Sequence, residues 1–389
     1  MTRLPTDILN DPTLIAVLDA IEARGKRAYL VGGAVRNALL GQPVDDIDIA
    51  TDALPDQVTQ LAADAGLKPV PTGIAHGTVT VVANGRGFEV TTFRRDIETD
   101  GRHAIVTFSD NLAEDAHRRD FTMNALYADR DGHIVDPVGG LPDLSAKTLR
   151  FVGQPEQRIQ EDYLRILRFF RFYAWYGEKA APEAVAACAA LKDGLARIAR
   201  ERIGSEIRKL LAAPDPVASI RLMKQTGVLD QILTNAKPEA VAELVETEKR
   251  EQVSPFWPRR LAALSDGRDC SRELRLSKDE IRTLDALARA VDAGWTLDEA
   301  GYRLGVSAAT DYILLAGAKG MELPANWPDR LRIASKAKLP IAARDLQPKL
   351  EGPALGRALQ AAETRWIASG FALTASELVA VALHAGDGA

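Results

Sequence analysis

The chain has 389 residues, more than one ordinary hydrophobic core holds, so we expect about two to four domains. With 46% hydrophobic and 26% charged residues, its composition is that of a globular protein. The sequence has no apolar run of the roughly 18 residues that a bilayer requires, and its first residues lack the pattern of a signal peptide. These features exclude a membrane-spanning protein and favour a cytoplasmic one. Two cysteines, Cys188 and Cys270, are too few for a disulfide framework or a cysteine-rich zinc site.

The net charge of −5 is unevenly distributed along the chain. Residues 1–142 carry 13 Lys and Arg against 21 Asp and Glu, whereas residues 143–212 carry 13 against 9 and are therefore basic. An acidic first segment suits metal binding, and a basic second segment suits contact with a phosphate backbone. Uneven surface charge is also common in proteins without either function, so the split alone does not decide between them.

Hydrophobic periodicity predicts a mixed α/β segment that ends near residue 140. The pair Asn84-Gly85 lies between two β-branched runs and predicts a hairpin. We expect a five-stranded mixed sheet flanked by helices. In chain order the predicted elements are a helix at 12–25, a strand at 29–31, a helix ending at 40, a strand at 47–50, a helix at 55–65 and strands at 67–70, 77–83 and 87–93.

The segment from Tyr29 to Leu40 joins a short apolar strand to a helix through Gly32 and Gly33. Glycines have no Cβ and let a ligand approach the backbone, and the N–H groups at the start of the following helix attract an anion. Arg36 adds a positive charge to this helix. The pattern predicts a phosphate pocket, although a plain Gly-Gly turn would explain the glycines taken alone.

Two carboxylates follow, Asp46 and Asp48, at the start of the next strand. Strand residues two positions apart point to the same side, so both side chains can hold one cation. A phosphate pocket next to a metal-binding carboxylate pair indicates chemistry on a nucleoside triphosphate. Glu89, in the later strand at 87–93, is with equal weight a third carboxylate of this site or a surface residue.

Residues 94–110 are polar and lack a core pattern, so we interpret them as a loop, either a mobile lid or a simple connection. A further element opens at residues 118–125. There Arg119 suits a contact with a sugar or phosphate, because a guanidinium is a permanently charged, forked donor. Asp120 is the residue we expect to orient Arg119. A surface Arg–Asp pair at a helix start is the alternative.

Residues 161–171 are predicted to form one helix that is apolar on most of its circumference and therefore largely buried. At about 100° per residue, Asp162, Arg165 and Arg168 share one face, whereas Arg171 falls roughly opposite Asp162. A buried row of arginines needs anionic partners, which a bound nucleotide would provide. A solvated face of ion pairs is the alternative explanation of this spacing.

The pair Asp162 and Arg165 also predicts base selection. A carboxylate accepts from the exocyclic amino group that cytosine and adenine share, and a guanidinium donates to their ring acceptors. Uracil and guanine carry a carbonyl at that position and would leave the carboxylate unpaired, which is a strong basis for rejection. The sequence therefore predicts a site that accepts CTP and ATP without a nucleic-acid template.

From about residue 155 helical periodicity continues to the end of the chain, with breaks near residues 213–216, 254–258 and 323–328. We therefore predict an α+β protein. Its expected segments are a head at residues 1–142, a helical neck at 143–213, a helical body at 214–300 and a helical tail at 301–389.

Between about Tyr29 and Arg208 the motifs resemble those of the bacterial class II CCA-adding enzymes, tRNA nucleotidyltransferases that share a polymerase-β-like head with bacterial poly(A) polymerases. The resemblance implies a polymerase-β-like nucleotidyltransferase head with a small mixed sheet, followed by an all-helical neck, body and tail. Asp136–Leu144 is similar to the family's hinge. The motifs that carry the resemblance are Gly-Gly-Ala-Val-Arg at 32–36, Asp-Ile-Asp at 46–48, Arg118–Ala125, Glu161-Asp162-x-x-Arg165 and Ile198–Glu206.

Carried over to these positions, the resemblance implies that Asp46 and Asp48 are catalytic and bind Mg²⁺. The implied reaction adds CCA to the 3′ end of tRNA from CTP and ATP, with the basic neck and the tail holding the acceptor arm and without a protein partner. An A-adding tRNA nucleotidyltransferase or a poly(A) polymerase is the alternative. The implied nucleotide-binding residues are Gly33, Arg36, Arg119, Asp162, Arg165, Arg168 and Arg171.

The sequence departs from the family at Asn37, where an Asp usually follows the motif arginine, and we expect a weaker orientation of Arg36. The Arg-Arg-Phe signature of bacterial poly(A) polymerases is missing, Gly73–Val79 is similar to the CCA-adding type, and the segment 94–105 has the full length that CC-only members lack. Two further rivals fit less well. A small-molecule nucleotidyltransferase needs no long helical part, and a non-catalytic nucleotide-binding protein needs no Asp pair.

Overall fold

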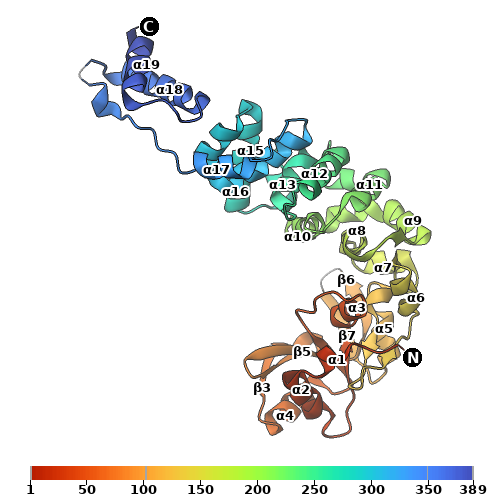
Figure 1. Cartoon of the computed structure of the whole chain (residues 1–389). Coiled ribbons are helices and arrows are strands. Elements are labelled where there is room, and N and C mark those ends of the chain that lie inside the picture. Colours follow the sequence, from red (N-terminus) through yellow and green to blue (C-terminus); the bar gives the residue numbers. More distant parts are fainter. Residues whose placement is uncertain (1, 101–102, 348, 388–389) are drawn as a thin grey trace. The chain divides into compact units, whose positions relative to one another are not determined.

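The computed structural model describes residues 2–100, 103–347 and 349–387 and divides into two compact units, Met1–Ile232 and Leu233–Ala389. The first unit is mixed α/β at its start and mainly helical afterwards, and every described element of the second unit is helical (Figure 1). This confirms the predicted α+β class. The division into four segments at residues 142, 213 and 300 stays a prediction.

A seven-stranded mixed sheet forms the centre of the α/β part, in the order β3-β4-β5-β2-β1-β8-β9. Strands β2 and β5 run parallel, and all other neighbours are antiparallel. The predicted number of five strands was too low, because β8 and β9 have two residues each and show no alternating pattern. The strands are Ala28–Val31 (β1), Asp48–Thr51 (β2), Lys68–Gly73 (β3), Thr78–Ala83 (β4), Arg86–Thr92 (β5), Tyr127–Ala128 (β8) and Ile134–Val135 (β9).

Helices α2 and α4 lie against this sheet (Figure 1). The apolar residues of α2 recur at helical spacing, and Leu14, Leu18 and Ile21 of the expected apolar face are buried, whereas Ile15 is only partly buried. The helices of this part are Thr6–Leu9 (α1), Pro12–Glu22 (α2), Gly33–Leu39 (α3), Pro55–Asp64 (α4), Leu112–His117 (α5) and Gly140–Ser145 (α6), with 3₁₀ turns at Ile74–His76 (η1) and Thr122–Asn124 (η2).

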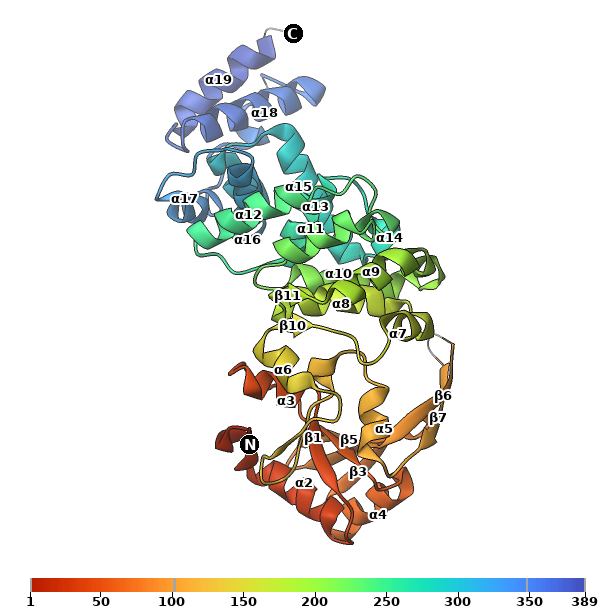
Figure 2. The same ribbon diagram turned by 90° about the vertical axis from the view of Figure 1, so that its right-hand side faces the viewer.

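Two hairpins connect or extend the strands. Asn84 and Gly85 have positive φ angles of 49° and 79° and join β4 to β5, which confirms the predicted hairpin. The interpretation of residues 94–110 as a loop was wrong: Arg94–Asp100 (β6) pairs with His103–Phe108 (β7), while residues 101 and 102 lie outside the described residues (Figure 2). This ribbon is not part of the main sheet, so its strands lack the core pattern on which sequence-based recognition depends.

Helices dominate the first unit beyond residue 155, and α8 packs on α10 and α11 (Figure 2). A two-residue parallel pair, Thr148–Leu149 (β10) with Lys179–Ala180 (β11), interrupts the neck that was predicted to be all-helical. Strands of this length carry no sequence pattern. The helices are Pro155–Glu161 (α7), Leu164–Tyr176 (α8), Pro182–Leu191 (α9), Arg200–Leu211 (α10) and Val217–Gln225 (α11), with 3₁₀ turns at Lys192–Arg197 (η3) and Leu229–Gln231 (η4).

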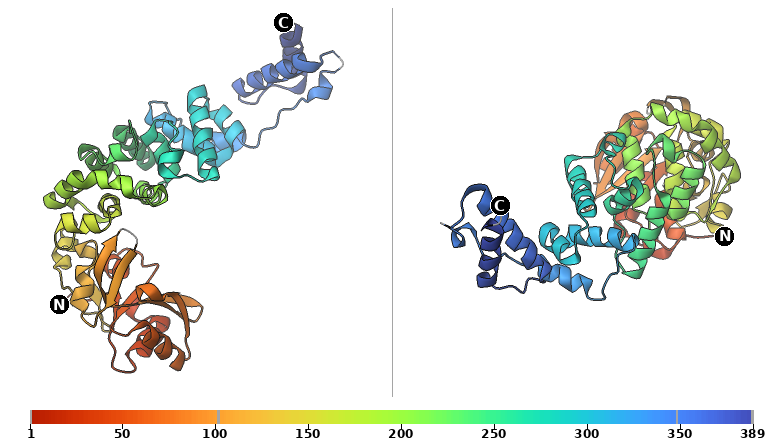
Figure 3. Two further views of the ribbon diagram at one scale, coloured as in Figure 1. Left: turned by 180° about the vertical axis from the view of Figure 1, so that it is seen from behind. Right: turned by 90° about the horizontal axis from the view of Figure 1, so that it is seen from above.

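The second unit ends in two helices that lie side by side, α18 and α19 (Figure 3). None of the helices described in either unit is long and apolar enough to cross a membrane. The helices of the second unit are Pro238–Arg250 (α12), Trp257–Ser265 (α13), Ser271–Leu274 (α14), Lys278–Ala293 (α15), Leu297–Ala318 (α16), Trp327–Ala334 (α17), Gly352–Ala368 (α18) and Ala375–Asp387 (α19), with a 3₁₀ turn at Ala343–Asp345 (η5).

A buried ionic cluster holds α12, α13 and α16 together. Arg259 and Arg260 of α13 are 2% and 1% exposed and both donate to the carboxylate of Glu248 in α12. Arg259 also donates through Nη1 to Asp311 Oδ1 of α16 at 2.7 Å. Buried charges are tolerated when they are paired and hydrogen-bonded, so the second unit has an interior of its own that depends on Glu248.

Candidate nucleotide and metal site

The turn between β1 and α3 is flanked by two guanidinium groups. Gly32 has φ 68° and ψ −120°, a conformation that favours glycine. A Cβ at Gly32 would lie 3.5 Å from Arg119 Nη1, and one at Gly33 would lie 3.7 Å from Arg36 Nη2. The structure therefore brings two of the predicted nucleotide-binding arginines to the predicted phosphate turn.

The predicted carboxylate pair lies beside this turn. Asp48 opens β2, and its Cα is the register partner of Val31, the residue before Gly32, on one side and of Glu89 in β5 on the other. Residues paired across parallel strands point to the same face, so the side chains of Asp48 and Glu89 are neighbours. Asp46 precedes the strand and is exposed. These carboxylates and a glycine turn with two arginines occupy one edge of the sheet.

The charges around Asp48 suit a cation. Surrounding protein atoms displace part of the water around its exposed side chain and raise its pKa, as do the charges of Glu89 and, to a smaller extent, Asp46, while Arg119 lowers it. When the protein neutralises the repulsion between neighbouring carboxylates only in part, these carboxylates attract a divalent ion. Their oxygens are the ligands that such an ion prefers. Asp46, Asp48 and Glu89 are therefore the residues that fit a metal at this edge.

Arg119 is held by residues that the sequence did not single out. Its Nη2 donates to Asp115 Oδ2 at 3.0 Å, its Nε donates to the Tyr127 hydroxyl at 2.9 Å, and that hydroxyl donates to Asp115 Oδ2 at 2.7 Å. The prediction that Asp120 orients Arg119 was wrong. Asp115 and Arg119 are four residues apart, the spacing of neighbours on a helix surface, and this spacing was a signal that could have identified Asp115.

Asp120 instead binds an arginine of α8. Its Oδ2 accepts from Arg168 Nε at 2.9 Å and Nη2 at 2.5 Å, and its Oδ1 accepts from the backbone N–H of Phe121 and from Asn124 Nδ2. Burial acts to raise the pKa of Asp120, but the charge of Arg168 and the Asn124 hydrogen bond outweigh it and hold the pKa below its ordinary value. Asp120 thus connects the residues after α5 to α8.

Asp162 does not lie in a helix. The single helix predicted over 161–171 is two helices, α7 and α8 (Figure 2), and Asp162, with an extended φ of −153°, separates them. Its Oδ1 accepts from the backbone N–H of Leu164 at 3.0 Å, and its Oδ2 accepts from Arg202 Nη2 of α10 at 2.6 Å. An Asp that bonds the backbone two residues on favours a turn over a helix, so the 100° spacing does not hold across this position.

The arginines of α8 have protein carboxylates as partners. Arg165 pairs with Glu161 and also donates to the carbonyl of Arg158 at 2.7 Å. Arg168 pairs with Asp120 as described, and Arg171 Nε donates to Glu206 Oε2 of α10 at 2.5 Å. Protein carboxylates thus partner this row, one from the adjacent α7 and two from segments farther away along the chain, and its contact with a nucleotide stays a prediction.

Arg36 differs from these arginines because its described hydrogen-bond partners are all neutral oxygens. They are Asn37 Oδ1 at 2.9 and 3.1 Å, Asn124 Oδ1 at 2.5 Å and the Tyr176 hydroxyl at 2.9 Å. Burial lowers the pKa of Arg36. The Asn37 amide also donates to the carbonyl of Pro43, so Asn37 contributes to the orientation of Arg36, and the expected weakening relative to an Asp stays a prediction.

Comparison with known proteins identifies the family. The model of the poly(A) polymerase head domain matches residues 28–150, and that of a probable RNA and SrmB binding site of polymerase A matches residues 179–243. A CCA-adding enzyme of Leuconostoc citreum is 41% identical over 64% of this chain. One of Lacticaseibacillus paracasei is 33% identical over 95% of both chains. The chain belongs to the CCA-adding enzyme family.

The solved structures agree with this assignment. The crystal structure of the Bacillus stearothermophilus CCA-adding enzyme in complex with CTP superposes with a TM-score of 0.73, at 30% identity and over 96% of each chain. The predicted polymerase-β-like head with a helical remainder is thereby confirmed. The alignments with the first curated CCA-adding relatives span 52 to 62% of the length of those relatives.

One cluster of side chains of the metal-ligand type lies outside the proposed nucleotide site. Among the described residues, Asp129, Asp131 and His133 form a cluster whose ligand-type atoms lie within 4.8 Å of one another. They form the turn between β8 and β9, where Asp129 Oδ1 accepts from the backbone N–H groups of Asp131 at 3.0 Å and His133 at 2.8 Å. The turn itself accounts for this cluster.

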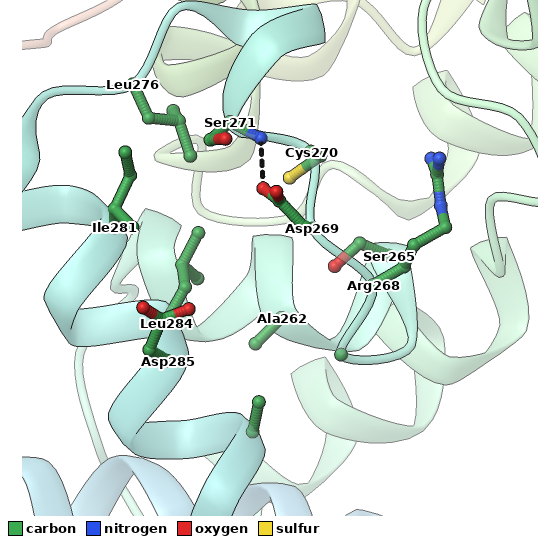
Figure 4. A pocket seen from close by; sticks show the side chains of 12 residues that line it. Ala262, Ser265, Arg268, Asp269, Cys270, Ser271, Leu276, Ile281, Leu284 and Asp285 are labelled. Atoms are coloured by element: carbon green, nitrogen blue, oxygen red, sulfur yellow. Dashed lines mark hydrogen bonds between the residues drawn. The ribbon is translucent and has the colours of Figure 1, made fainter.

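A pocket in the second unit is lined by residues of α13 to α15 (Figure 4). Asp269 faces the backbone of Ser271 and accepts its N–H at 2.8 Å (Figure 4). Burial raises the pKa of the Cys270 thiol to about 11, so this group is protonated and a poor nucleophile near pH 7. The pocket contains none of the predicted nucleotide-binding residues of the CCA-adding motifs and offers no activated group.

Proposed function

We propose that this chain catalyses the template-independent addition of CCA to the 3′ end of tRNA, with CTP and ATP as substrates. The observation that carries the proposal is the arrangement at the Gly32–Gly33 turn, which Arg36 and Arg119 flank and to which Asp48 is adjacent on the next strand. Cations beside a metal-binding carboxylate edge suit a triphosphate bound to a divalent ion. The CTP complex of the structural relative from Bacillus stearothermophilus supports the same substrate class.

We propose that Asp46 and Asp48 hold Mg²⁺ and that Glu89 supports them as a third carboxylate. When bound, the metal supplies Lewis-acid stabilisation of the reacting phosphate and of the attacking hydroxyl. The chain's own contribution is to place these oxygens next to the glycine turn and to keep Arg119 close to Asp48, where the Asp115–Tyr127 pair holds it.

The proposed nucleotide contacts divide between the phosphates and the base. Gly33, Arg36 and Arg119 lie at the glycine turn and are assigned to the phosphates and sugar. Arg168 and Arg171, which lie in α8, are assigned to the same nucleotide. Asp162 and Arg165 are assigned to the base. A carboxylate has about four acceptor positions, so the bonds that Asp162 makes to Leu164 and Arg202 leave room for an exocyclic amino group.

The proposed partner is the acceptor arm of tRNA, and the proposed compartment is the cytoplasm. Residues 143–212 are basic, and double-stranded RNA is bound mainly through its shape and backbone. The helical second unit extends the surface available for such contacts. Protein partners are not part of the proposal.

The deciding experiment supplies the full chain with Mg²⁺, a tRNA transcript that lacks its terminal CCA, and each labelled triphosphate. Addition of two C residues and then one A supports the proposal. Addition of one A only to a transcript ending in CC indicates an A-adding enzyme, and long A tails indicate a poly(A) polymerase. Absence of any transfer overturns the proposal.

Three substitutions test the assigned roles. Asp46→Ala and Asp48→Ala should each abolish addition while the circular dichroism spectrum stays that of the wild type, because they remove metal ligands exposed at the sheet edge. Asp162→Ala should instead relax the choice of base, measured as the ratio of kcat/KM for CTP to that for UTP. An unchanged ratio would remove the assignment of Asp162 to the base.

A further inference from the structure

Three guanidinium groups surround the ring of Phe172 in α8. The guanidinium carbons of Arg36, Arg168 and Arg171 lie 5.2, 5.5 and 4.2 Å from the ring centroid. Arg36 comes from α3 and the other two from α8, so the ring joins cations of separate elements. A guanidinium within about 6 Å of an aromatic centroid is attracted to the negative face of the ring.

These three cations are close enough to repel one another. Burial is the main cause of the lowered pKa of Arg36, and the charge of Arg171 lowers it further. The Tyr176 hydroxyl and the charge of Asp120 act to raise this pKa. Asp120 pairs with Arg168 and Glu206 with Arg171, whereas the described hydrogen-bond partners of Arg36 are neutral. The cluster therefore carries one positive charge more than its direct carboxylate partners neutralise, and the quadrupole of an aromatic ring offsets part of the remaining repulsion.

We propose that Phe172 is a positioning residue that holds Arg36, Arg168 and Arg171 in the arrangement in which they receive the nucleotide. The inference rests on the proposed function and names a residue that acts through the three arginines. The ring is 6% exposed, so it is not a surface on which a base stacks. Its role is to keep three like charges in one place before the anionic ligand arrives.

The surroundings of the ring fix its position. Phe121 and Tyr176 are ring neighbours of Phe172, with centroids 5.2 and 5.7 Å from its own. The Tyr176 ring also lies 3.9 Å from the Arg36 guanidinium, and its hydroxyl accepts from Arg36 Nη2. Aromatic neighbours thus hold the ring in place, and its π-system contacts the arginines.

A matched residue separates positioning from packing. Phe169 lies in the same helix, is fully buried and contacts Phe121, Phe151 and Phe170. Among the described residues its ring pairs are with aromatic rings, and no guanidinium lies over its ring. Leu substitution at either position removes a ring from the core, but only the change at Phe172 removes contacts with cations.

The experiment replaces Phe172 with mono-, di- and perfluorinated phenylalanine in the full chain and measures the Kd for CTP and ATP by calorimetry with Mg²⁺. Fluorination weakens the negative face of the ring while its shape is nearly kept, so the Kd should rise stepwise with the number of fluorines, by between about 2- and 30-fold at the perfluorinated ring. The same series at Phe169 should leave the Kd unchanged. Phe172→Leu and Phe169→Leu, compared in the same assay, should lower the unfolding temperature similarly but weaken binding only at position 172.

Each outcome bears on a different claim. If the fluorinated series leaves the Kd constant, or if Phe169 substitutions weaken binding as much, the role of Phe172 is overturned while nucleotide binding stands. If the wild-type chain binds neither CTP nor ATP, the proposed function itself fails. The wild-type chain tests nucleotide binding and the fluorinated series tests the role of Phe172, so failure of the proposed function and failure of the Phe172 role give different results.

Discussion

Asp120 is a single side chain that connects two elements through separate oxygens. Oδ2 binds Arg168 of α8, and Oδ1 binds the backbone of Phe121 and the amide of Asn124. Its pKa is held below the ordinary value, because the favourable contacts of the ionised form exceed the effect of burial. A carboxyl group whose pKa falls on folding stabilises the native state only while it is ionised.

Asp120→Asn should lower the free energy of unfolding by about 3 kcal/mol near pH 7, because Arg168 loses its charged partner. The unfolded-state pKa of Asp is about 4 and the native one is lower, so the stability that ionised Asp120 provides is complete above about pH 4 and is lost as the pH falls below it. Urea unfolding of both proteins from pH 7 to pH 3 measures the difference. A difference that stays constant to pH 3 would contradict this account.

The sequence predicted which arginines lie at the same site better than it predicted which carboxylates bind them. Arg36 and Arg119 meet at the glycine turn, as the motif order predicts, but Asp115 rather than Asp120 holds Arg119, and Asp120 holds Arg168. A guanidinium has five N–H donors and can donate to any nearby carboxylate. Which carboxylate it binds therefore depends on tertiary packing. Spacing along the chain could have indicated Asp115, four residues before Arg119, but not the pairing of Asp120 with Arg168, 48 positions later.

At the scale of elements, the break between α7 and α8 depends on Tyr163 as well as on Asp162. A Cβ on Gly194 in η3 would lie 1.9 Å from Cδ1 of the Tyr163 ring, so only glycine leaves room for this ring. The ring fills the space beside the chain break, and the guanidinium of Arg197 lies 5.5 Å from its centroid. The position of Asp162 therefore depends on a residue more than thirty positions later.

Gly194→Ala should lower the free energy of unfolding by about 2 kcal/mol, because the ring of Tyr163 must move to make space. A matched control is Gly356→Ala in α18, where nothing lies within 4 Å of the added Cβ; this change should stabilise by up to about 1 kcal/mol through helix propensity. Thermal unfolding of both variants tests the pair. Equal effects at the two positions would refute the close approach at Gly194.

Secondary structure was predictable where an apolar face repeats and was missed where it does not. The period of α2 and the Asn84-Gly85 turn identified their elements, whereas the β6–β7 ribbon has no core-facing pattern and the pairs β8–β9 and β10–β11 are too short to have one. The single helix expected over 161–171 failed for a different reason. Its apolar residues suit a helix, but Asp162 bonds the backbone of Leu164 and interrupts it.

At the scale of the whole molecule, each of the two units has buried residues of its own. The first is built around the sheet and α8, and the second around α12, α13 and α16 with Glu248 at the centre of its buried charges. A ligand stabilises the unit that binds it, by about 2.7 kcal/mol when its concentration is 100 times the Kd. The proposed nucleotide residues all lie in the first unit.

Glu248→Gln should lower the stability of the second unit by roughly 4 kcal/mol, because Arg259 and Arg260 both lose the charge of Glu248 and Arg259 keeps only Asp311 as a described carboxylate partner. In differential scanning calorimetry we expect one transition to shift downward in this variant, while saturating CTP raises the other. The Kd for CTP should equal that of the wild type. A variant that no longer binds CTP would show that the two interiors are not independent.

The contact between Arg36 and Asn124 ties together segments that are 88 positions apart. A chimaera that takes the glycine turn from one relative and residues beyond 120 from another takes the two partners of this hydrogen bond from different parents. Asn37, Asn124 and Tyr176 all accept from the same guanidinium, so they form a set that must be exchanged jointly. Segment swaps within this family should therefore succeed when their boundaries keep the set within one parent and lose nucleotide affinity when they divide it.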